Sequence, residues 1–344
     1  MPELRRDPVT GRWVCLAPGR ASRPESVPAA IIANRGPSTH CPFCPGNEAS
    51  TPPEVGAVRD GTAPDTPGWL VRAIPNLFPA FSAEEGPADL SNPLNELGPA
   101  LGQCEVIIHS PDHDRWLPEL SQEQAELVMR VTWERYRRHA VPGAASVVAL
   151  YNHGREAGAS LAHPHGQLFA TRVSSPELEL EMAGADAAYR SSGSCVFCRM
   201  LEQEIVAGER IVAEDDAYIA IAPWASRSPF ETWIIPRFHV ADFGQTAGDM
   251  AEKAGAFLRK VLWRLAQELG DVPINWYIHS VPNAAGETVE SYHWHLEIRP
   301  RLGEVAGFEM ATGTMINTLP PEAAAHRLRG HGDPDPDQSP PPSR

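Results

Sequence analysis

The chain has 344 residues, 42% of them hydrophobic, and a formal net charge of −15 at pH 7. This length can bury a sizeable core and allows two domains of about 150 residues each, whereas the acidic balance argues against a nucleic-acid partner bound through its phosphates. No apolar run approaches the roughly 20 residues that span a bilayer, and no apolar signal core follows the first residues, so the sequence predicts a cytoplasmic protein without a membrane partner.

Two Cys-x-x-Cys pairs stand far apart in the chain. Cys41 and Cys44 follow a short first strand predicted at 10–18, and Cys195 and Cys198 lie in the second half. In a cytosolic chain such pairs favour a metal over a disulfide. Because tetrahedral zinc needs four ligands, each pair predicts a metal site that other residues complete; reduced structural cysteines are the alternative.

The first half continues with a strand, a helix and another strand. The strand at 105–109 leads to His113, and Ser121 then caps an amphipathic helix that extends to about His139. The apolar, β-branched run at 146–151 suits a buried strand. It leads directly into a polar loop.

This loop, 152–167, has the composition most typical of an active site. Glycines punctuate it, and it ends in His163 and His165, separated by one proline. In extended backbone, residues i and i+2 point to one face, so one ring can be anchored while its neighbour attacks an electrophile. The glycines let backbone N–H groups approach an anion. Two surface histidines on a hairpin are the alternative, which Ser160 and Gln167 beside them make less favourable.

The second half repeats this order of elements. A strand, a histidine, a helix and another strand are predicted at 231–235, His239, about 246–269 and 274–279. His113 and His163 are 50 residues apart, and His239 and His293 are 54 apart. One unit has therefore been duplicated, and each half is predicted to be a mainly antiparallel sheet with a packed helix, related to the other by a pseudo-two-fold axis. The fold class is α+β.

The duplication also completes the metal sites. The predicted ligands are Cys41, Cys44, His113 and His163 at the first site, and Cys195, Cys198, His239 and His293 at the second. Four protein ligands leave no position for substrate, so both metals are predicted to be structural. The predicted organisation is a catalytic half at 1–180, a degenerate half at 181–330 that ends in a short helix at 320–330, and a disordered tail at 331–344.

His-Pro-His-Gly-Gln at 163–167, with Asn152, Gly158 and Ser160 upstream, resembles the signature of galactose-1-phosphate uridylyltransferase. This family is the transferase branch of the histidine-triad superfamily, whose hydrolase and lyase branches have a third histidine where Gln167 stands here. The resemblance extends over about 12–329. It implies two tandem histidine-triad-like half-domains.

The resemblance also implies substrate-binding residues, namely Arg20, Arg23, Asn76, Asn152, Gly158, Ser160 and Gln167. It implies zinc at the first metal site. Some relatives hold iron at the second site with histidines and a glutamate, so zinc and iron are alternatives there, and His279 and His295 are rival ligands. Finally it implies a homodimer in which Arg20 and Arg23 reach the partner's site.

The expected reaction is nucleotidyl transfer, with His165 as the nucleophile. Neutral imidazole would attack the α-phosphorus of UDP-glucose, expel glucose 1-phosphate and form a uridylyl-histidine, from which galactose 1-phosphate takes the UMP in a ping-pong sequence. Gln167 would donate a hydrogen bond to a non-bridging oxygen. In the second half Glu297 replaces this glutamine, and that half is predicted to be catalytically silent.

Two other functions remain as alternatives. Near 309–317 the sequence departs from the better-known family members, which have a glutamine that contacts the sugar, and it resembles relatives that include nucleotide-sugar phosphorylases. The first alternative is thus a phosphorylase that uses inorganic phosphate on ADP-glucose or a dinucleoside polyphosphate. A non-catalytic zinc scaffold is the second, and the acidic charge and the intact histidine loop both argue against it.

Overall fold

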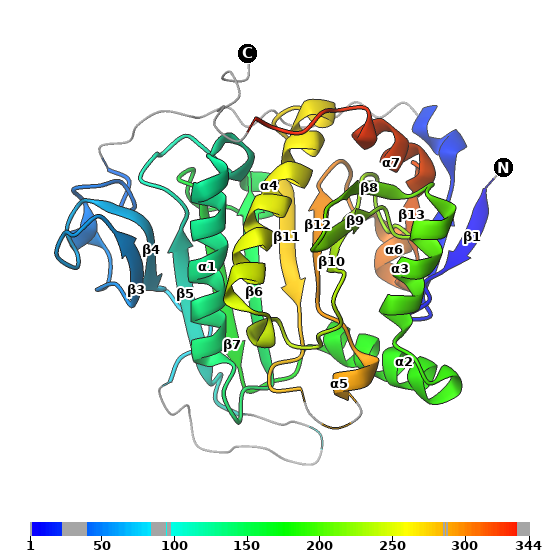
Figure 1. The fold of residues 1–344 in the computed structure, drawn as a ribbon, viewed down its shortest axis with the longest axis horizontal. Helices are drawn as coiled ribbons and strands as arrows, with labels where there is room; N and C mark the ends of the chain where they lie inside the picture. Colours follow the sequence, from blue (N-terminus) through cyan, green and yellow to red (C-terminus); the bar gives the residue numbers. More distant parts are fainter. Residues whose placement is uncertain are drawn as a thin grey trace.

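A ten-stranded antiparallel sheet forms the centre of the molecule (Figure 1). The computed structural model describes residues 2–22, 40–83, 94, 98–284, 286 and 288–335. The strands of the first half are β3 (Gly56–Arg59), β4 (Trp69–Pro75), β5 (Gly102–Ile108), β6 (Ser146–His153) and β7 (His165–Thr171). Those of the second half are β8 (Ile211–Glu214), β9 (Tyr218–Ile221), β10 (Thr232–Pro236), β11 (Ile274–His279) and β12 (His295–Pro300).

The order of the strands is symmetric about its middle. It runs β3-β4-β5-β7-β6 and then β11-β12-β10-β9-β8, so β6 and β11 pair at the centre and every other strand has an equivalent in the opposite half. This confirms the predicted α+β fold of two tandem half-domains related by a pseudo-two-fold axis. Since both halves contribute to one sheet, their equivalent positions can be compared strand by strand.

The register defines those equivalent positions. His165 is the first residue of β7, and Gln167 lies opposite Val106 on β5. His295 is likewise the first residue of β12, and Glu297 lies opposite Trp233 on β10. Side chains alternate between the faces of a strand, so each histidine points to the same face as the third residue of its strand.

Two long helices cover the other face of the sheet. They are α1 (Gln122–His139), which Ser121 caps by accepting from the Gln124 N–H, and α4 (Gly248–Leu269). The two lie side by side (Figure 1), and Gly255 allows their close contact because a Cβ there would come within 2.2 Å of the Ala125 carbonyl oxygen. Their buried faces pack on alternate strand residues such as Leu168 and Leu296.

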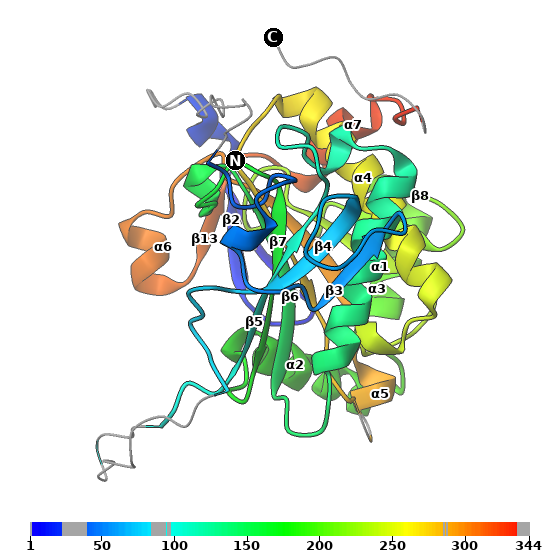
Figure 2. The same ribbon diagram turned by 90° about the vertical axis from the view of Figure 1, so that its left-hand side faces the viewer.

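A smaller sheet and α6 (Gly307–Thr312) lie on the opposite side of the large sheet (Figure 2), whereas α7 (Pro321–Arg329) packs against α4 and β8. The small sheet contains β1 (Glu3–Arg6), β2 (Trp13–Leu16) and β13 (Met315–Asn317), the last parallel to β2. The remaining helices are α2 (Pro176–Ser192), α3 (Val196–Ala207) and α5 (Thr288–Ser291). The strand predicted at 10–18 corresponds to β2, and the C-terminal helix to α7.

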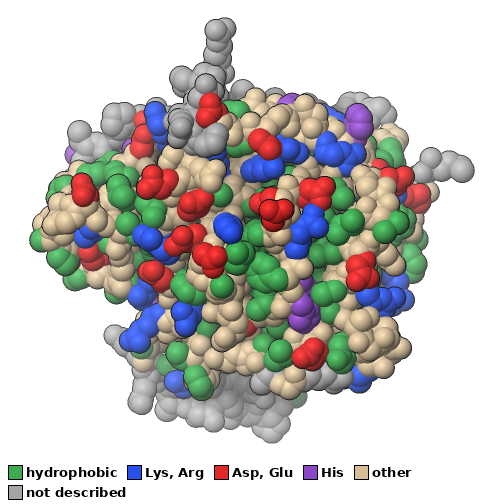
Figure 3. Space-filling view, in the orientation of Figure 1, with side chains coloured by type: hydrophobic (Ala, Val, Ile, Leu, Met, Phe, Trp, Pro, Cys, Tyr) green, Lys and Arg blue, Asp and Glu red, His purple; other side chains and the backbone are tan. Residues whose placement is uncertain are grey.

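The surface over α1 and α4 has interspersed acidic and basic side chains rather than a basic patch (Figure 3). No helix in the described ranges is long and apolar enough to cross a membrane. Most of the predicted tail, from 336 onward, lies outside the described residues.

Candidate active site and metal centres

The His165 ring is anchored on one side and open on the other. Its Nδ1–H donates to the carbonyl oxygen of His163 at 2.8 Å, which leaves the lone pair on Nε2 available. The ring is only 7% exposed and lines a cavity of about 180 Å³. Burial lowers the pKa of His165, and the hydrogen bond to the His163 carbonyl opposes this only in part. The ring is therefore neutral near pH 7, as nucleophilic attack requires.

Three of the predicted substrate-binding residues share this cavity with His165. They are Asn76, just beyond the end of β4, Ser160 in the loop before β7, and Gln167 in β7 itself. Phe43 contacts the His165 ring edge-on, with 5.1 Å between the ring centroids. The side chain of Phe78, at the cavity, is 85% exposed. The cavity thus combines polar groups at the nucleophile with apolar side chains along its wall.

Asn152, Gly158 and Arg20, three other predicted substrate-binding residues, do not line this cavity. Asn152 lies at the end of β6 and accepts a hydrogen bond from the Asn275 amide at 2.8 Å. Gly158 packs near Asn152 and has a φ of +95°, which favours glycine. Arg20 is exposed in a 3₁₀ helix. Arg23 lies outside the described residues.

The four predicted ligands of the first metal site come together. Their ligand atoms all lie within 4.8 Å of one another, and the His163 Nδ1 is 3.7 Å from the Sγ atoms of both Cys41 and Cys44. The His113 Nδ1 is 3.2 Å from the Cys44 Sγ. Sulfur and nitrogen ligands of tetrahedral zinc lie roughly 3.5 Å apart, given bonds of about 2.3 and 2.0 Å. The residues therefore fit such an ion.

The protonation pattern at this site also fits a metal. His163 donates from Nε2 to the Ser110 carbonyl at 2.8 Å, so its Nδ1 faces the sulfurs with a lone pair. Burial lowers the pKa of His163 to about 4. Burial and the neighbouring Cys41 raise the pKa of Cys44 to about 11, because two adjacent thiolates repel each other unless a cation lies between them.

The second predicted ligand set also comes together. Cys195, Cys198, His239 and His293 place their ligand atoms within 4.8 Å of one another. The Cys198 Sγ lies 3.3 Å from the His239 Nδ1 and 3.6 Å from the His293 Nδ1. His239, the equivalent of His113, donates from Nε2 to the Val289 carbonyl at 2.8 Å. The two clusters are thus built alike.

The rival ligands His279 and His295 belong to a different cluster, together with Glu181 and Glu297. Here His279 donates to Glu181 at 2.8 Å. Burial lowers the pKa of His279, but the two carboxylates outweigh burial and raise this pKa to about 9, so the ring is cationic. Arg227 forms an ion pair with Glu297. Both carboxylates thus have cationic partners, and because the four ligand atoms lie within 4.8 Å of one another, this cluster is a candidate metal site distinct from the Cys₂His₂ set.

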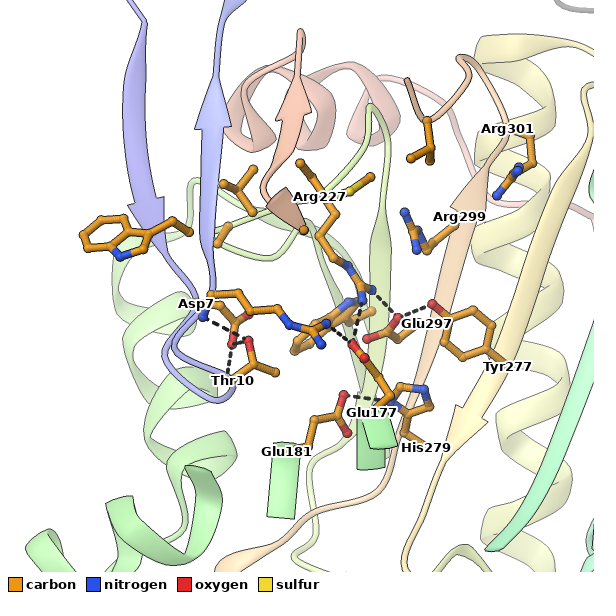
Figure 4. Close-up of a pocket in the computed structure, with 18 residues that line it drawn as sticks. Asp7, Thr10, Glu177, Glu181, Arg227, Tyr277, His279, Glu297, Arg299 and Arg301 are labelled. Atoms are coloured by element: carbon orange, nitrogen blue, oxygen red, sulfur yellow. Dashed lines mark hydrogen bonds and ion pairs between the residues drawn. The ribbon is translucent and has the colours of Figure 1, made fainter. Parts of the chain in front are cut away.

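Two residues that the sequence did not single out distinguish the second half, Trp233 and Arg227. Trp233 occupies the position equivalent to Val106 and stacks on His295, with 4.9 Å between the centroids and 28° between the planes. His295 is fully buried. Arg227 binds the carboxylate that replaces the Gln167 amide (Figure 4). The duplicated spacing could have identified Trp233, since a bulky aromatic replaces a small residue there.

Comparisons with known proteins cover nearly the whole chain. A family model described as galactose-1-phosphate uridyl transferase, N-terminal domain, matches residues 1–175. The ADP-glucose phosphorylase of Arabidopsis thaliana is 33% identical over 95% of this chain and 92% of its own length. The galactose-1-phosphate uridylyltransferase of Thermotoga maritima is 28% identical over 96% of this chain and 98% of its own.

A solved structure is similar over the same extent. The crystal structure of the ADP-glucose phosphorylase from Arabidopsis thaliana with bound ADP-glucose has a TM-score of 0.83 and 31% sequence identity, and the match covers 96% of this chain and 99% of that one.

Proposed function

The chain belongs to the galactose-1-phosphate uridylyltransferase family, and from this premise we propose that it transfers a nucleotidyl group from a nucleotide sugar to a phosphate-bearing acceptor through a covalent intermediate on His165. The observation that carries the proposal is the geometry of His165, whose Nδ1–H is held by the His163 carbonyl while Nε2 is left for an electrophile in the cavity. A non-catalytic zinc scaffold would not require a histidine ring that is held in place with its Nε2 facing a cavity.

In the first half-reaction, Nε2 of His165 attacks the α-phosphorus. A P–N bond forms, the bond to the bridging oxygen breaks, and the sugar 1-phosphate leaves with the electron pair. A phosphate leaving group needs little proton donation. The ring becomes positively charged, and the Nδ1–H bond to the His163 carbonyl stabilises this charge.

Gln167 supports the transition state in this proposal. It follows His165 by two residues on β7 and faces the same cavity, so its amide can donate to a non-bridging oxygen as charge develops. Asn76 and Ser160 would hold the remaining phosphate and ribose oxygens. The acceptor phosphate then attacks the same phosphorus and regenerates the free ring.

We assign structural zinc to both Cys₂His₂ clusters. At the first cluster, His163 is a ligand through Nδ1 while its own carbonyl accepts from His165. The ion would therefore fix the backbone that orients the nucleophile. No ligand of the second cluster lines the His165 cavity, so we assign this cluster a contribution to stability alone.

For the substrates, we propose ADP-glucose as donor and inorganic phosphate as acceptor. The support is the greater similarity to the ADP-glucose phosphorylase, 33% against 28% identity, and the absence of glutamine from 309–317. Transfer of UMP from UDP-glucose to galactose 1-phosphate is the second candidate, which the family as a whole and the Thermotoga maritima relative favour.

One labelling experiment tests both the mechanism and the donor. The protein is mixed with ADP-glucose or UDP-glucose labelled at the α-phosphorus, and we expect acid-labile, base-stable label on the protein, as for a phosphoramidate. Inorganic phosphate should discharge the label as ADP, whereas galactose 1-phosphate should leave it in place. Label that persists in His165→Gly, or none from either donor, would disprove the covalent mechanism. Discharge by galactose 1-phosphate alone would establish the second candidate.

We further propose a homodimer with shared sites. Arg20 is exposed and lies outside the His165 cavity, which suits contact with a partner. Trp13 and the α6 residues Phe308 and Met310 are also exposed, at 50%, 53% and 72%. If subunits share a site, mixing His165→Gly with Arg20→Ala protein should restore activity that neither has alone. A monomer in sedimentation that is fully active would disprove this.

A further inference from the structure

A second cavity, of about 380 Å³, lies over β11 and β12 in the second half (Figure 4). The small sheet forms its outer wall with Val14 and Met315, and Arg12 lies just before β2. It is located on the same face of the large sheet as the His165 cavity, and Glu297 lines it from the position equivalent to Gln167. The duplication has therefore left a second hollow where the first half has its candidate active site.

Three of the four acidic side chains that line this cavity have cationic partners, and the fourth, Asp7, accepts from the Val9 and Thr10 N–H groups. Arg227 forms ion pairs with Glu297 and Glu231, and His279 donates to Glu181. In the same way, Arg12 is paired with Glu177. These contacts give each of the carboxylates a partner without any ligand.

Two further arginines have no such partners. Arg299 in β12 and Arg301 immediately after it both line the cavity, and neither side chain has a hydrogen bond or an ion pair with any residue in the described ranges. They follow Glu297 at intervals of two, so all three point to one face of the strand. Figure 4 shows both guanidinium groups free of the dashed contacts that join Arg227 to Glu297.

This pair of charges has no evident role in the stability of the fold. Arg299 is half-buried and Arg301 is exposed, so only Arg299 bears a cost of burial, and two like charges at close range repel each other. At the equivalent positions of β7 the first half has Phe169 and Thr171, which are neutral. The repeated unit therefore does not require cations here, and a bound anion would offset both the repulsion and the cost of burial.

We propose that this cavity binds a small phosphate monoester, with its phosphate held by Arg299 and Arg301. Planar guanidinium groups bind phosphate oxygens through paired N–H donors. The apolar side chains of Val14, Val305 and Met315 on the cavity wall give room for an organic group, which distinguishes an ester from inorganic phosphate. The site is separate from His165, and the inference does not depend on the proposed reaction.

Equilibrium dialysis of the full chain with labelled glucose 1-phosphate, and separately with labelled inorganic phosphate, tests this site. The variant is Arg299→Gln with Arg301→Gln, and the matched control is Arg138→Gln together with Arg137→Gln, which removes two exposed charges from α1. We expect the first variant to lose one equivalent of bound glucose 1-phosphate, with affinity at least about tenfold weaker. The control should bind as wild type does.

Two further measurements distinguish this site from the candidate active site. Labelling of His165 by the nucleotide sugar should proceed at the wild-type rate in the double variant, and its thermal unfolding should show that it folds. Unchanged binding of glucose 1-phosphate by the folded variant, or an equal loss in the control, would overturn the proposal. If the site bound inorganic phosphate but not glucose 1-phosphate, the proposal of a monoester ligand would be wrong, and the two arginines would be assigned to free phosphate.

Discussion

The two halves of the molecule have the same sheet, the same pattern of metal ligands and different residues around the central histidine. In the first half His165 faces an open cavity, with Val106 and Gln167 beside it. In the second half Trp233 stacks on the equivalent histidine, and an arginine binds the carboxylate beside it. A duplicated unit can thus keep its sheet and its metal ligands while a few substituted side chains block substrate from reaching the central histidine.

The largest expected effect comes from exchanging the central histidine in either half. His165→Gly should lower the rate of nucleotidyl transfer roughly 10⁴- to 10⁶-fold yet still bind the nucleotide, because Asn76, Ser160 and Gln167 remain. His295→Gly should leave the rate near that of wild type, because the ring is fully buried. Single-turnover kinetics together with nucleotide binding will check both. A large loss of rate in folded His295→Gly would contradict the comparison.

Exchanging the third residue of the strand should have the next largest effect. Gln167→Ala should slow both half-reactions roughly 10²- to 10³-fold, the usual contribution of one oxyanion donor. Gln167→Glu introduces the residue of the second half and should be slower still, since a carboxylate repels the phosphate. Rates of formation and discharge of the intermediate measure this. If Gln167→Glu were as fast as wild type, the amide would have no catalytic role.

Removing one ligand from each metal cluster should show which cluster orients His165 and which only stabilises the fold. Cys41→Ser and Cys195→Ser should each lose about one equivalent of metal and unfold more readily. Cys41→Ser should in addition lower activity roughly 10- to 100-fold, because the backbone of His163 orients His165. Metal analysis, thermal unfolding and rate measurements on the same samples check this. Equal loss of activity in both variants would show that the second cluster also affects the nucleophile.

The smallest effect concerns pH. In the second half His279 takes the position of Asn152. Burial lowers the pKa of His279, but the carboxylates of Glu181 and Glu297 outweigh this effect and raise the pKa to about 9. Because this pKa is higher than the value of about 6.5 in the unfolded chain, protonation of His279 stabilises the fold fully below about pH 6.5. The stabilisation disappears as the pH rises through 9. It amounts to roughly 3 kcal/mol. The free energy of unfolding, measured with urea, should therefore fall between about pH 6 and pH 10 in wild type and fall less in His279→Asn. An equal dependence of this free energy on pH in the two proteins would contradict the prediction.

Local patterns in the sequence predicted much of this architecture. The cap at Ser121 and the apolar spacing of 122–139 predicted α1, the β-branched run at 146–151 predicted β6, and the repeated order of elements predicted β11. The repeated spacing of cysteines and histidines predicted two ligand sets that the structure brings together. These features depend on residues that are close in sequence or on a repeat that can be counted.

The remaining features depend on contacts between distant segments. Neither α2 nor α3 was predicted, although Ser175 caps α2 and a glycine ends each helix. The role of Trp233 follows from the register of β10 against β12, and that of Arg227 from its approach to Glu297. The sequence could not show which substrate-binding residues share the His165 cavity, because Asn76 reaches it from another strand.

The small sheet has a consequence for synthesis on the ribosome. Its middle strand, β2, pairs with β13, a partner near the opposite end of the chain. A nascent chain grows at about 5–20 residues per second, so one edge of β2 stays unpaired until residues 315–317 have been synthesised. An unpaired strand edge is prone to join other chains. Because β2 and β13 also form the outer wall of the second cavity, that cavity is closed late, after the strands around His165 have emerged.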